Sequence, residues 1–319
     1  MRIVGVSRIL NEEHLIEAFI RHHAALLDLQ IVLDGGSTDR TMAILAALHA
    51  EGVPLQVFQT ASPIFVEQVY NTGLYRLALN EGADWVCFLD ADELLDLSRI
   101  PEGLAAFLHL VPPEIACLAV SAFRYLAPDA AAAPEPNPFQ RLTRRETRPH
   151  MQKLVARRLD PARITIYAGS HGAFVDGVAD HGLSQDRLVL AHFPERTPLQ
   201  AARKAILGRL KALATGAAVA AEASIHYDAA FHALQDDPRR WLEQAATDHA
   251  ARQDLVHDPV HYRGTALCYT RPPDDLADLI AQFAVQAARL ARSHGDLLDR
   301  KRLIRTEMLK AAAVVRRVI

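Results

Sequence analysis

Two aspartates one residue apart, Asp90 and Asp92, directly follow the apolar run 85–89 and precede Glu93. Carboxylates with this spacing at the end of a strand can both reach a hard divalent cation, Mg²⁺ or Mn²⁺. Such a cation can bridge the diphosphate oxygens of a nucleotide. A solvated acidic turn is the alternative interpretation. The buried character of the preceding run and the third carboxylate favour a metal site at Asp90 and Asp92.

A second acidic cluster, Asp34-Gly35-Gly36-Ser37-Thr38-Asp39, follows the apolar run 30–33. The glycines allow the backbone to come close to a ligand. We expect Asp34 to accept a hydrogen bond from a nucleotide base. Asp39 either contacts the base or ribose, or it caps the helix that follows.

Short apolar runs alternate with segments of helical spacing in the first part of the chain. The runs 3–6, 30–33, 53–58 and 85–89 are typical of buried strands, whereas 15–26, 41–50 and 66–77 have helical periodicity. This alternation predicts an α/β fold with a mostly parallel sheet and helices on both faces. Ligands bind beyond the carboxyl ends of the strands in such sheets, and both acidic clusters lie there.

From residue 198 onward the chain is rich in Ala, Leu and Arg, and strand patterns disappear. We therefore expect two parts, a nucleotide-binding and catalytic domain over 1–197 and a mainly helical region over 198–319. The segment 300–319 contains seven basic residues and one acid, interleaved with apolar residues. Such a basic amphipathic helix either lies on an anionic membrane surface or packs on its own domain or on a dimer partner.

Composition excludes several classes of protein. Half of the 319 residues are hydrophobic, which is enough for a core, and the net charge of −3 argues against a nucleic-acid partner. Three scattered cysteines, Cys87, Cys117 and Cys268, exclude a disulfide framework or zinc knuckle and favour the reducing cytoplasm. The N-terminus has no signal-peptide pattern, and no apolar stretch approaches the ~20 residues of a membrane-spanning helix.

Four segments together resemble the family 2 glycosyltransferases, which have the GT-A fold and use nucleotide-diphosphate sugars. They are Asn11-Glu12-Glu13, Leu33 to Thr41, Asn71-Thr72-Gly73 and Trp85 to Glu93. The likeness covers about the first 95 residues and extends more loosely to about residue 210. Many members carry a second Asp where this chain has Gly35, which leaves Asp34 as the expected base ligand.

The resemblance implies roles for particular residues. Residues expected to bind the nucleotide sugar are Asn11, Asp34, Asp39, Asn71, Asp90 and Lys153. Lys153 would neutralise the charge of the diphosphate, and an ordinary surface lysine is the alternative interpretation. For Asn71 the alternative interpretation is a role in helix packing. His192 stands after the last core strand, where it either joins Asp90 and Asp92 as a metal ligand or merely closes the strand.

Family resemblance also implies inversion, which requires a general base to deprotonate the acceptor hydroxyl. We select Asp176 and His171 as catalytic candidates, with Asp180 as the substitute for Asp176 and a structural role as the alternative for His171. The base is expected in the segment after the strands that carry the metal ligands. Asp176 follows an expected strand and turn over 164–172, which would bring it to the carboxyl edge of the sheet.

The expected function is that of a metal-dependent hexosyltransferase. It would move a sugar from a nucleotide-diphosphate donor, a UDP-sugar, to a saccharide, lipid-linked or small-molecule acceptor. It would act in the cytoplasm, as a homodimer or in peripheral contact with a membrane. The alternatives are a non-catalytic nucleotide-sugar-binding protein on a GT-A frame and a metal-dependent nucleotidyltransferase or phosphohydrolase. Intact metal ligands argue against the first, and the Asp34–Asp39 cluster argues against the second.

Overall fold

Four parallel strands form the part of the sheet that corresponds to the predicted βαβ units. They are β1 (Ile3–Ile9), β2 (Leu29–Asp34), β3 (Leu55–Gln59) and β4 (Trp85–Phe88), arranged in the order β4-β1-β2-β3. The computed structural model describes residues 1–60, 62, 66–126, 137–194, 197–216, 224–250, 255–271, 275–299 and 316–318. All four strands point their carboxyl ends toward one edge, so the loops after β2 and β4 open on the same side.

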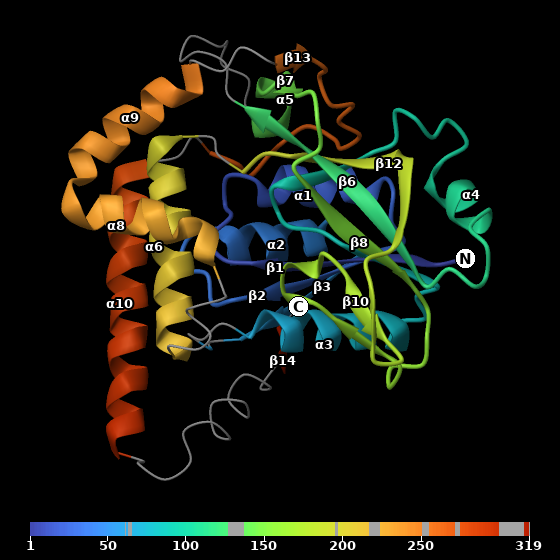
Figure 1. Cartoon of the computed structure of the whole chain (residues 1–319), viewed down its shortest axis with the longest axis horizontal. Coiled ribbons are helices and arrows are strands. Elements are labelled where there is room, and N and C mark those ends of the chain that lie inside the picture. Colours follow the sequence, from blue (N-terminus) through green and yellow to red (C-terminus); the bar gives the residue numbers. More distant parts are fainter. Residues whose placement is uncertain are drawn as a thin grey trace.

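Helices cover both faces of this parallel section (Figure 1). Helices α1 (Ile16–Ala24) and α2 (Thr41–Ala50) pack on one face, where Phe19 and Leu45 join Val32 in the core. Helix α3 (Glu67–Asn80) packs on the other face, where Leu74 contacts the core that contains Ile31. Because adjacent strand residues point to opposite faces, strands covered on both faces are apolar throughout.

The remaining strands extend the sheet with mixed directions. Strand β8 (Met151–Arg157) is antiparallel to β4 and to β6 (Cys117–Leu126), and β6 is parallel to β12 (Leu183–His192). Strand β5 (Glu93–Asp96) pairs with β12, and β7 (Arg144–Glu146) pairs with β6. Strands β9 (Ile164–Ile166), β10 (Ala173–Val175) and β11 (Val178–Asp180) form a separate small sheet. The predicted α/β fold class, with helices around a large central sheet, is confirmed.

Short helical elements complete this part of the chain, namely α4 (Leu104–His109), α5 (Pro138–Arg141) and the 3₁₀ turn η1 (Ala168–Ser170). The large helices follow after residue 197. They are α6 (Pro198–Thr215), α8 (Asp228–Asp236), α9 (Pro238–Ala250) and α10 (Asp275–Asp299), with the 3₁₀ turn η2 (Ile225–Tyr227) before α8. The start of α6 is fixed by Thr197, whose hydroxyl accepts the Gln200 N–H, and by Pro198 in the first turn.

Helices α6 and α10 lie side by side across the carboxyl ends of the parallel strands, at the left of Figure 1. The mainly helical C-terminal region is thereby confirmed, although it also adds two short strands to the sheet. Strand β13 (Leu255–His257) pairs with β7, and β14 (Arg316–Arg317) pairs with β3. Most of the basic segment, residues 300–315, lies outside the described residues. At Arg316 and Arg317 the predicted helix is wrong, because their backbone bonds to the open edge of β3.

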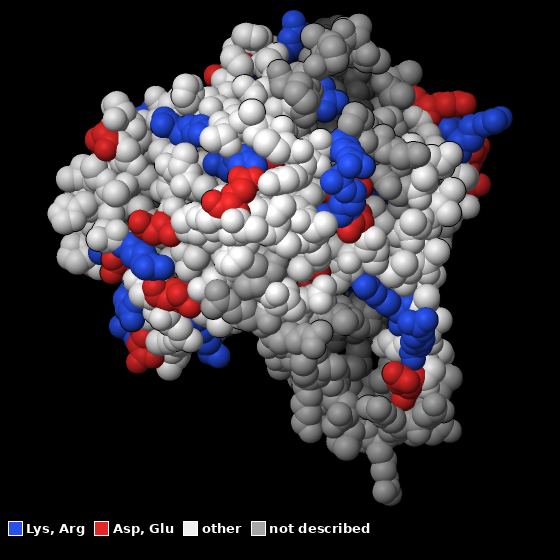
Figure 2. Space-filling model, turned by 180° about the vertical axis from the view of Figure 1, so that it is seen from behind, with Lys and Arg blue, Asp and Glu red and all other residues white. Residues whose placement is uncertain are grey.

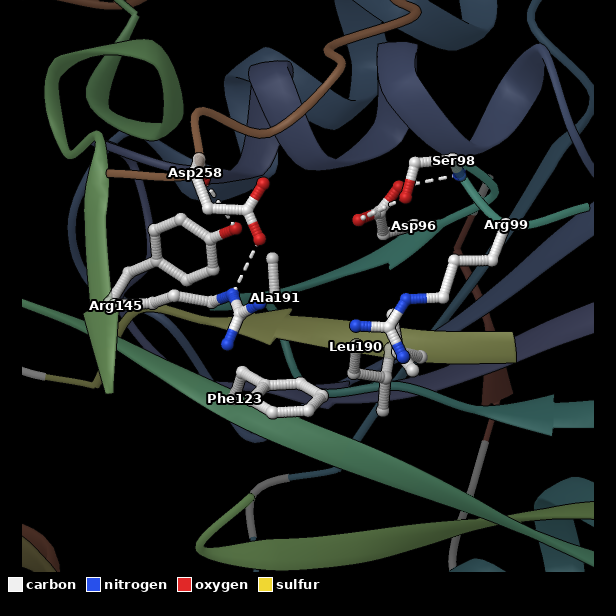
Figure 3. A pocket seen from close by; sticks show the side chains of 10 residues that line it. Asp96, Ser98, Arg99, Phe123, Arg145, Leu190, Ala191 and Asp258 are labelled. Carbon is white, nitrogen blue, oxygen red and sulfur yellow. Dashed lines mark hydrogen bonds and ion pairs between the residues drawn. The ribbon is translucent and has the colours of Figure 1, made fainter. Parts of the chain in front are cut away.

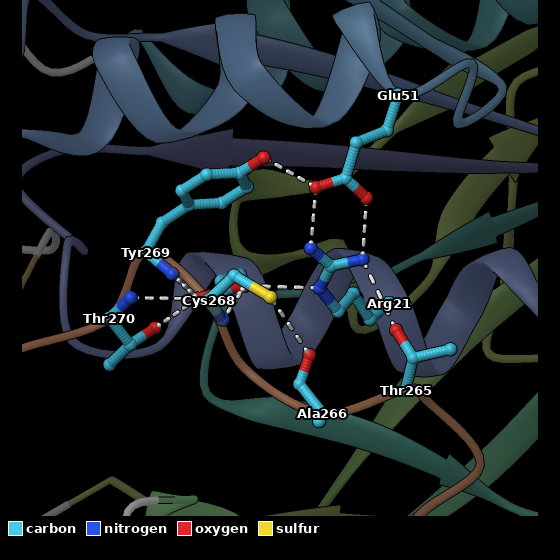
Figure 4. A network of polar contacts seen from close by, with 8 residues as sticks. Arg21, Glu51, Thr265, Ala266, Cys268, Tyr269 and Thr270 are labelled. Atoms are coloured by element: carbon cyan, nitrogen blue, oxygen red, sulfur yellow. Dashed lines mark hydrogen bonds and ion pairs between the residues drawn. The ribbon is translucent and has the colours of Figure 1, made fainter.

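Residues 255–271 return to α1 and are held there by a polar network (Figure 4). The fully buried Glu17 accepts the backbone N–H groups of Cys268, Tyr269 and Thr270. Arg21 pairs with Glu17 and with Glu51. Burial alone would raise the pKa of Glu17, but the hydrogen bonds to its carboxylate bring that pKa below its ordinary value. This network joins the C-terminal part of the chain to α1 and to the end of α2.

Surface charge is mixed in sign. On the face shown in Figure 2, basic and acidic side chains lie beside one another and form no continuous patch of one sign. In the described ranges, no helix is long and apolar enough to cross a membrane.

Candidate functional site

The turn after β4 carries the first acidic cluster. Glu93 begins β5 and lies opposite His192 of β12 in the strand register. The Glu93 carboxylate is fully buried, and its Oε2 accepts the backbone N–H of Asp90 at 2.9 Å. Burial raises the pKa of Glu93 to about 8. Glu93 thus fixes the turn that presents Asp90 and Asp92.

Lys153 reaches this turn from β8. Antiparallel pairing of β8 with β4 places Val155 opposite Cys87, so Lys153 extends beyond the end of β4. Its Nζ lies 2.5 Å from Asp90 Oδ2 and 3.6 Å from Glu93 Oε1, and the side chain is only 3% exposed. Burial would lower the pKa of Lys153, but the two carboxylates outweigh this effect and raise it. The alternative interpretation, an ordinary surface lysine, is wrong, since Lys153 is buried against the acidic cluster.

Asp92 is in contact with residues from two other parts of the chain. His192 Nε2 lies 3.7 Å from Asp92 Oδ2, and the Lys204 ammonium of α6 forms an ion pair with the same oxygen. The other ring nitrogen of His192 shares a hydrogen bond of 2.8 Å with Nε2 of His150, and the two rings stack. Burial, with His192 and Arg124 nearby, lowers the pKa of His150 to about 4.

His150 and Lys204 were not expected from the sequence. His150 stands immediately before β8, and only its position three residues ahead of Lys153 connects it to the predicted site. Lys204 is part of a helix whose composition gives no functional signal, and only tertiary packing places it on Asp92.

The chemistry of Asp90, Asp92 and His192 suits a divalent cation, because carboxylate oxygen and neutral imidazole nitrogen are both ligands for Mn²⁺. Within the described part of the chain, however, no three His, Cys, Asp or Glu side chains are grouped so as to hold a metal. The ammonium groups of Lys153 and Lys204 pair with the carboxylates of Asp90 and Asp92 instead. A cation at this position would compete with these two ammonium groups.

The loop after β2 carries the second acidic cluster. The Asp34 carboxylate is fully buried and accepts the N–H groups of Gly36 and Ser37, the Ser37 hydroxyl and the Gln59 side-chain amide. Gly36 has a φ of +88°, which an L-residue with a side chain adopts only with strain. Asp34 therefore shapes the loop through its own hydrogen bonds at the carboxyl edge.

Asn11 and Asp39 tie this loop to the segment after β1. Asn11 Oδ1 accepts the Thr38 N–H at 2.8 Å. Asp39 accepts the N–H of Thr41, the first residue of α2, at 2.9 Å and the N–H of Glu13 at 3.2 Å. Both side chains thus brace the Asp34 loop, and Asp39 performs the capping expected as its alternative role.

The other predicted residues lie around the small sheet. The Asn71 side chain of α3 donates to the Tyr167 carbonyl at 2.8 Å, so Asn71 holds the segment after β9 in place. His171 Nδ1 is hydrogen-bonded to the Gln152 carbonyl, next to Lys153. Burial lowers the pKa of His171, and the nearby charge of Lys153 lowers it further. The hydrogen bond to Gln152 only partly offsets these effects.

Asp176 occupies the turn between β10 and β11, where its φ is +51°. Both of its carboxylate oxygens are bound by Arg163, at 2.8 and 2.6 Å, and this ion pair is half exposed. Hydrogen bonding to Arg163 lowers the pKa of Asp176. Asp180 accepts the Gly182 N–H at 2.8 Å. The structure therefore brings Asp90, Asp92, Lys153 and His192 together and leaves Asp176 in a separate ion pair.

A pocket lies beside strands β5, β6 and β12 (Figure 3). The Phe123 ring lies in this pocket near two guanidinium groups. Its centroid is 4.3 Å from Cζ of Arg145 and 5.8 Å from Cζ of Arg99. Arg145 is paired with Asp258 at 2.6 Å. None of the residues predicted to act in catalysis or binding lines this pocket. The carboxyl edge, with its clustered ionisable groups, is the stronger candidate site.

Residues 9–151 match the family model described as glycosyl transferase family 2. This segment, which is less than half of the chain, is similar to the family 2 glycosyltransferases. The match contains both acidic clusters, the loop after β2 and the turn after β4, and it ends where β8 begins. No curated protein is significantly similar in sequence to this chain.

Solved structures resemble this chain at a distance. One is glucosyl-3-phosphoglycerate synthase from Mycobacterium tuberculosis in complex with phosphoglyceric acid. It is 27% identical over 39% of this chain and 44% of that chain, with a TM-score of 0.26. This chain therefore spans less than half of that protein. Another is the mannosyltransferase PcManGT from Pyrobaculum calidifontis in complex with GDP-Man and Mn²⁺. It is 14% identical over 93% of this chain and 87% of that chain, with a TM-score of 0.38.

Proposed function

We propose that this glycosyltransferase is a metal-dependent hexosyltransferase that takes its sugar from a UDP-sugar and transfers it with inversion. The observation that carries the proposal is the placement of Asp34 and Asp90 after two strands that are separated only by β1. Neighbouring strands lie about 4.8 Å apart, so the two strand ends are about 10 Å apart. One nucleoside diphosphate is long enough to contact both clusters.

Each cluster has a distinct role in this proposal. Asp34 binds the base, while Asn11, Asp39 and Asn71 contact the nucleoside or hold the segments that do. Asp90, Asp92 and His192 hold a divalent cation, Mn²⁺ or Mg²⁺, which would stabilise the charge of the leaving diphosphate. Lys153 keeps Asp90 ionised and adds positive charge beneath the diphosphate. Residues 1–197 form the nucleotide-binding and catalytic domain, and residues 198–319 form the helical region beside it.

The general base is proposed to be Asp176 or His171, with Asp180 as the substitute. His171 has the advantage of position, since it bonds to the residue next to Lys153. Asp176 would have to leave Arg163 before it could accept a proton. Asp176→Asn, Asp180→Asn and His171→Ala, compared at equal donor saturation, identify the base. Removal of the base lowers transfer by ~10²–10⁴ while donor affinity is retained. If all three variants transfer at the parental rate, the base lies elsewhere.

The decisive experiment is a thermal-shift screen of UDP-, GDP-, CDP- and ADP-sugars with and without Mn²⁺, followed by an assay of diphosphate release. A donor at a hundredfold excess over its Kd stabilises the protein by about 2.7 kcal/mol. Release that requires an acceptor supports the glycosyltransferase. Release at the same rate without acceptor indicates a phosphohydrolase, and binding without any turnover indicates a non-catalytic nucleotide-sugar-binding protein.

The surroundings of the enzyme are a further part of the proposal. We place it in the cytoplasm, with the basic residues of 300–315 available to an anionic membrane surface or a second copy of the chain. Sedimentation with vesicles of anionic lipid tests the first, and light scattering tests the second. Its acceptor is a saccharide, a lipid-linked molecule or another small molecule with a free hydroxyl.

A further inference from the structure

Helix α6 carries two lysines, Lys204 and Lys211, on the face toward the carboxyl edge of the sheet. Lys204 and Lys211 are seven residues apart, which is about two helical turns and about 10 Å along the axis. This distance matches the separation of the strand ends at β4 and β2. Lys204 pairs with Asp92 at the first strand end. Lys211, two turns further along the same face of α6, lies toward the second strand end, where the charge of Asp34 acts on its pKa.

Gly208 lies between the two lysines on the same face of α6. A Cβ atom at Gly208 would come within 2.9 Å of the Tyr227 ring, so the absence of a side chain allows this ring to pack against the helix. Burial raises the pKa of Tyr227, while the charge of Lys204 lowers it and that of Asp92 raises it. The turn η2 therefore packs on the face of α6 that carries Lys204 and Lys211. This face of α6 and the acidic loops after β2 and β4 form a seam.

Helix α10 adds a guanidinium group to this seam. Arg289 lies against Gly36 of the Asp34 loop, because a Cβ built at Gly36 would be 2.9 Å from Arg289 Nη1 and 3.0 Å from Nη2. Helices α10 and α6 are held together in part by the hydrogen bond from Arg203 to Gln282. Helices α6 and α10 of the C-terminal region lie beside the carboxyl edge of the parallel strands (Figure 1). Lys204 and Arg289 thus bring positive groups to the two predicted donor-binding loops.

The positive groups at the β2 end repel one another. Withdrawal of Lys211 from water, together with repulsion by Arg8 and Arg289, lowers the pKa of Lys211 to about 8, although Glu67 and Asp34 attract its charge. Arg8 is paired with Glu67 at 3.1 Å, so this carboxylate is shared. Cations held close together in a seam are stabilised when a polyanion enters between them, and a diphosphate is a polyanion of suitable size.

We propose that Lys211 of α6 and Arg289 of α10 bind the diphosphate of the donor nucleotide, so that the helical C-terminal region forms one wall of the donor site. This inference rests on the proposed function, since it requires a nucleoside-diphosphate donor. The carboxylates after β4 and the cations of α6 and α10 then face each other across the ligand. Lys204 neutralises Asp92 until a donor and its cation arrive.

The test is calorimetric titration of Lys211→Met and Arg289→Met with UDP and GDP in the presence of Mn²⁺, and with uridine and guanosine. Arg292→Met is the matched control, because Arg292 is exposed on the same helix. Each of the first two substitutions is expected to weaken diphosphate binding by about ten- to a hundredfold. Nucleoside affinity stays unchanged, the control binds within twofold of the parent, and Arg289→Lys recovers part of the loss.

Proton uptake supplies a second readout that needs no variant. When the parent binds a nucleoside diphosphate at pH 8, the half-ionised Lys211 gains a proton, and titrations in buffers of different ionisation enthalpy detect this uptake. If Lys211→Met and Arg289→Met bind UDP or GDP as tightly as Arg292→Met, the inference is overturned and the proposed function stands. Uptake that is absent from the parent also overturns it. If the parent binds none of the nucleoside diphosphates, the proposed function fails first and the inference fails with it.

Discussion

Replacement of Lys153 by Met tests whether the acidic turn depends on its buried cation. The substitution keeps the length of the side chain and removes the positive charge between Asp90, at 2.5 Å, and Glu93, at 3.6 Å. Breaking a buried ion pair by removing one partner costs about 3–5 kcal/mol. The Asp90 side chain is 41% exposed and water can solvate it, so we expect a loss of about 3 kcal/mol at pH 9.

The loss must depend on pH because of Glu93. Burial raises the pKa of Glu93 to about 8, well above its unfolded value. A raised pKa means that the contribution of Glu93 to stability is fully present below about pH 4.5 and is lost as the pH rises through about 8. Lys153 limits this loss by attracting the ionised carboxylate. At pH 5 Glu93 is protonated, only the exposed Asp90 loses a partner, and the expected cost falls to about 1 kcal/mol.

Urea unfolding of the parent and Lys153→Met at pH 5, 7 and 9 measures this dependence. Arg187→Met is the control, since it removes a guanidinium from the short exposed pair with Glu102 and should change stability little at any of the three pH values. A destabilisation of Lys153→Met that is equal at pH 5 and pH 9 would refute the role given to Glu93. A destabilisation no larger than that of the control would refute the buried ion pair itself.

Three further predictions concern ligands. Asp92→Asn should abolish Mn²⁺-dependent binding of nucleotide sugars in calorimetry, whereas Asp96→Asn at the far end of β5 should not. Equal binding by both would remove Asp92 from the metal site. Asp34→Ala should weaken UDP binding by about 1–3 kcal/mol and lower the melting temperature, because three donors of the loop and the side-chain amide of Gln59 lose their acceptor. Unchanged UDP affinity would move the base site elsewhere. Lys204→Met should tighten Mn²⁺ binding in the absence of nucleotide, since it removes the ammonium that pairs with Asp92. Weaker Mn²⁺ binding would show that the two do not compete.

The sequence by itself determined the parallel part of the fold and the edge of the sheet at which the candidate residues Asp34 and Asp90 lie. Apolar strands covered on both faces, joined by helices of regular period, are a local pattern, and a parallel sheet is the arrangement that buries them. The rule that ligands bind at the carboxyl ends of strands then placed Asp34 and Asp90 at one edge. The helical C-terminal region was likewise evident from composition.

Only the tertiary structure decided which charges meet. The pairing of β8 with β4 buried Lys153 against Asp90, although a lysine beside apolar residues in the sequence looks like a surface residue. Arg163, thirteen positions before Asp176, bound that carboxylate through the folding of the small sheet. Lys204 and Arg289 reached the two acidic loops from helices more than a hundred residues further along the chain. Electrostatic interactions act over a few ångströms in space irrespective of separation along the chain, so a pattern of neighbouring residues carries no record of them.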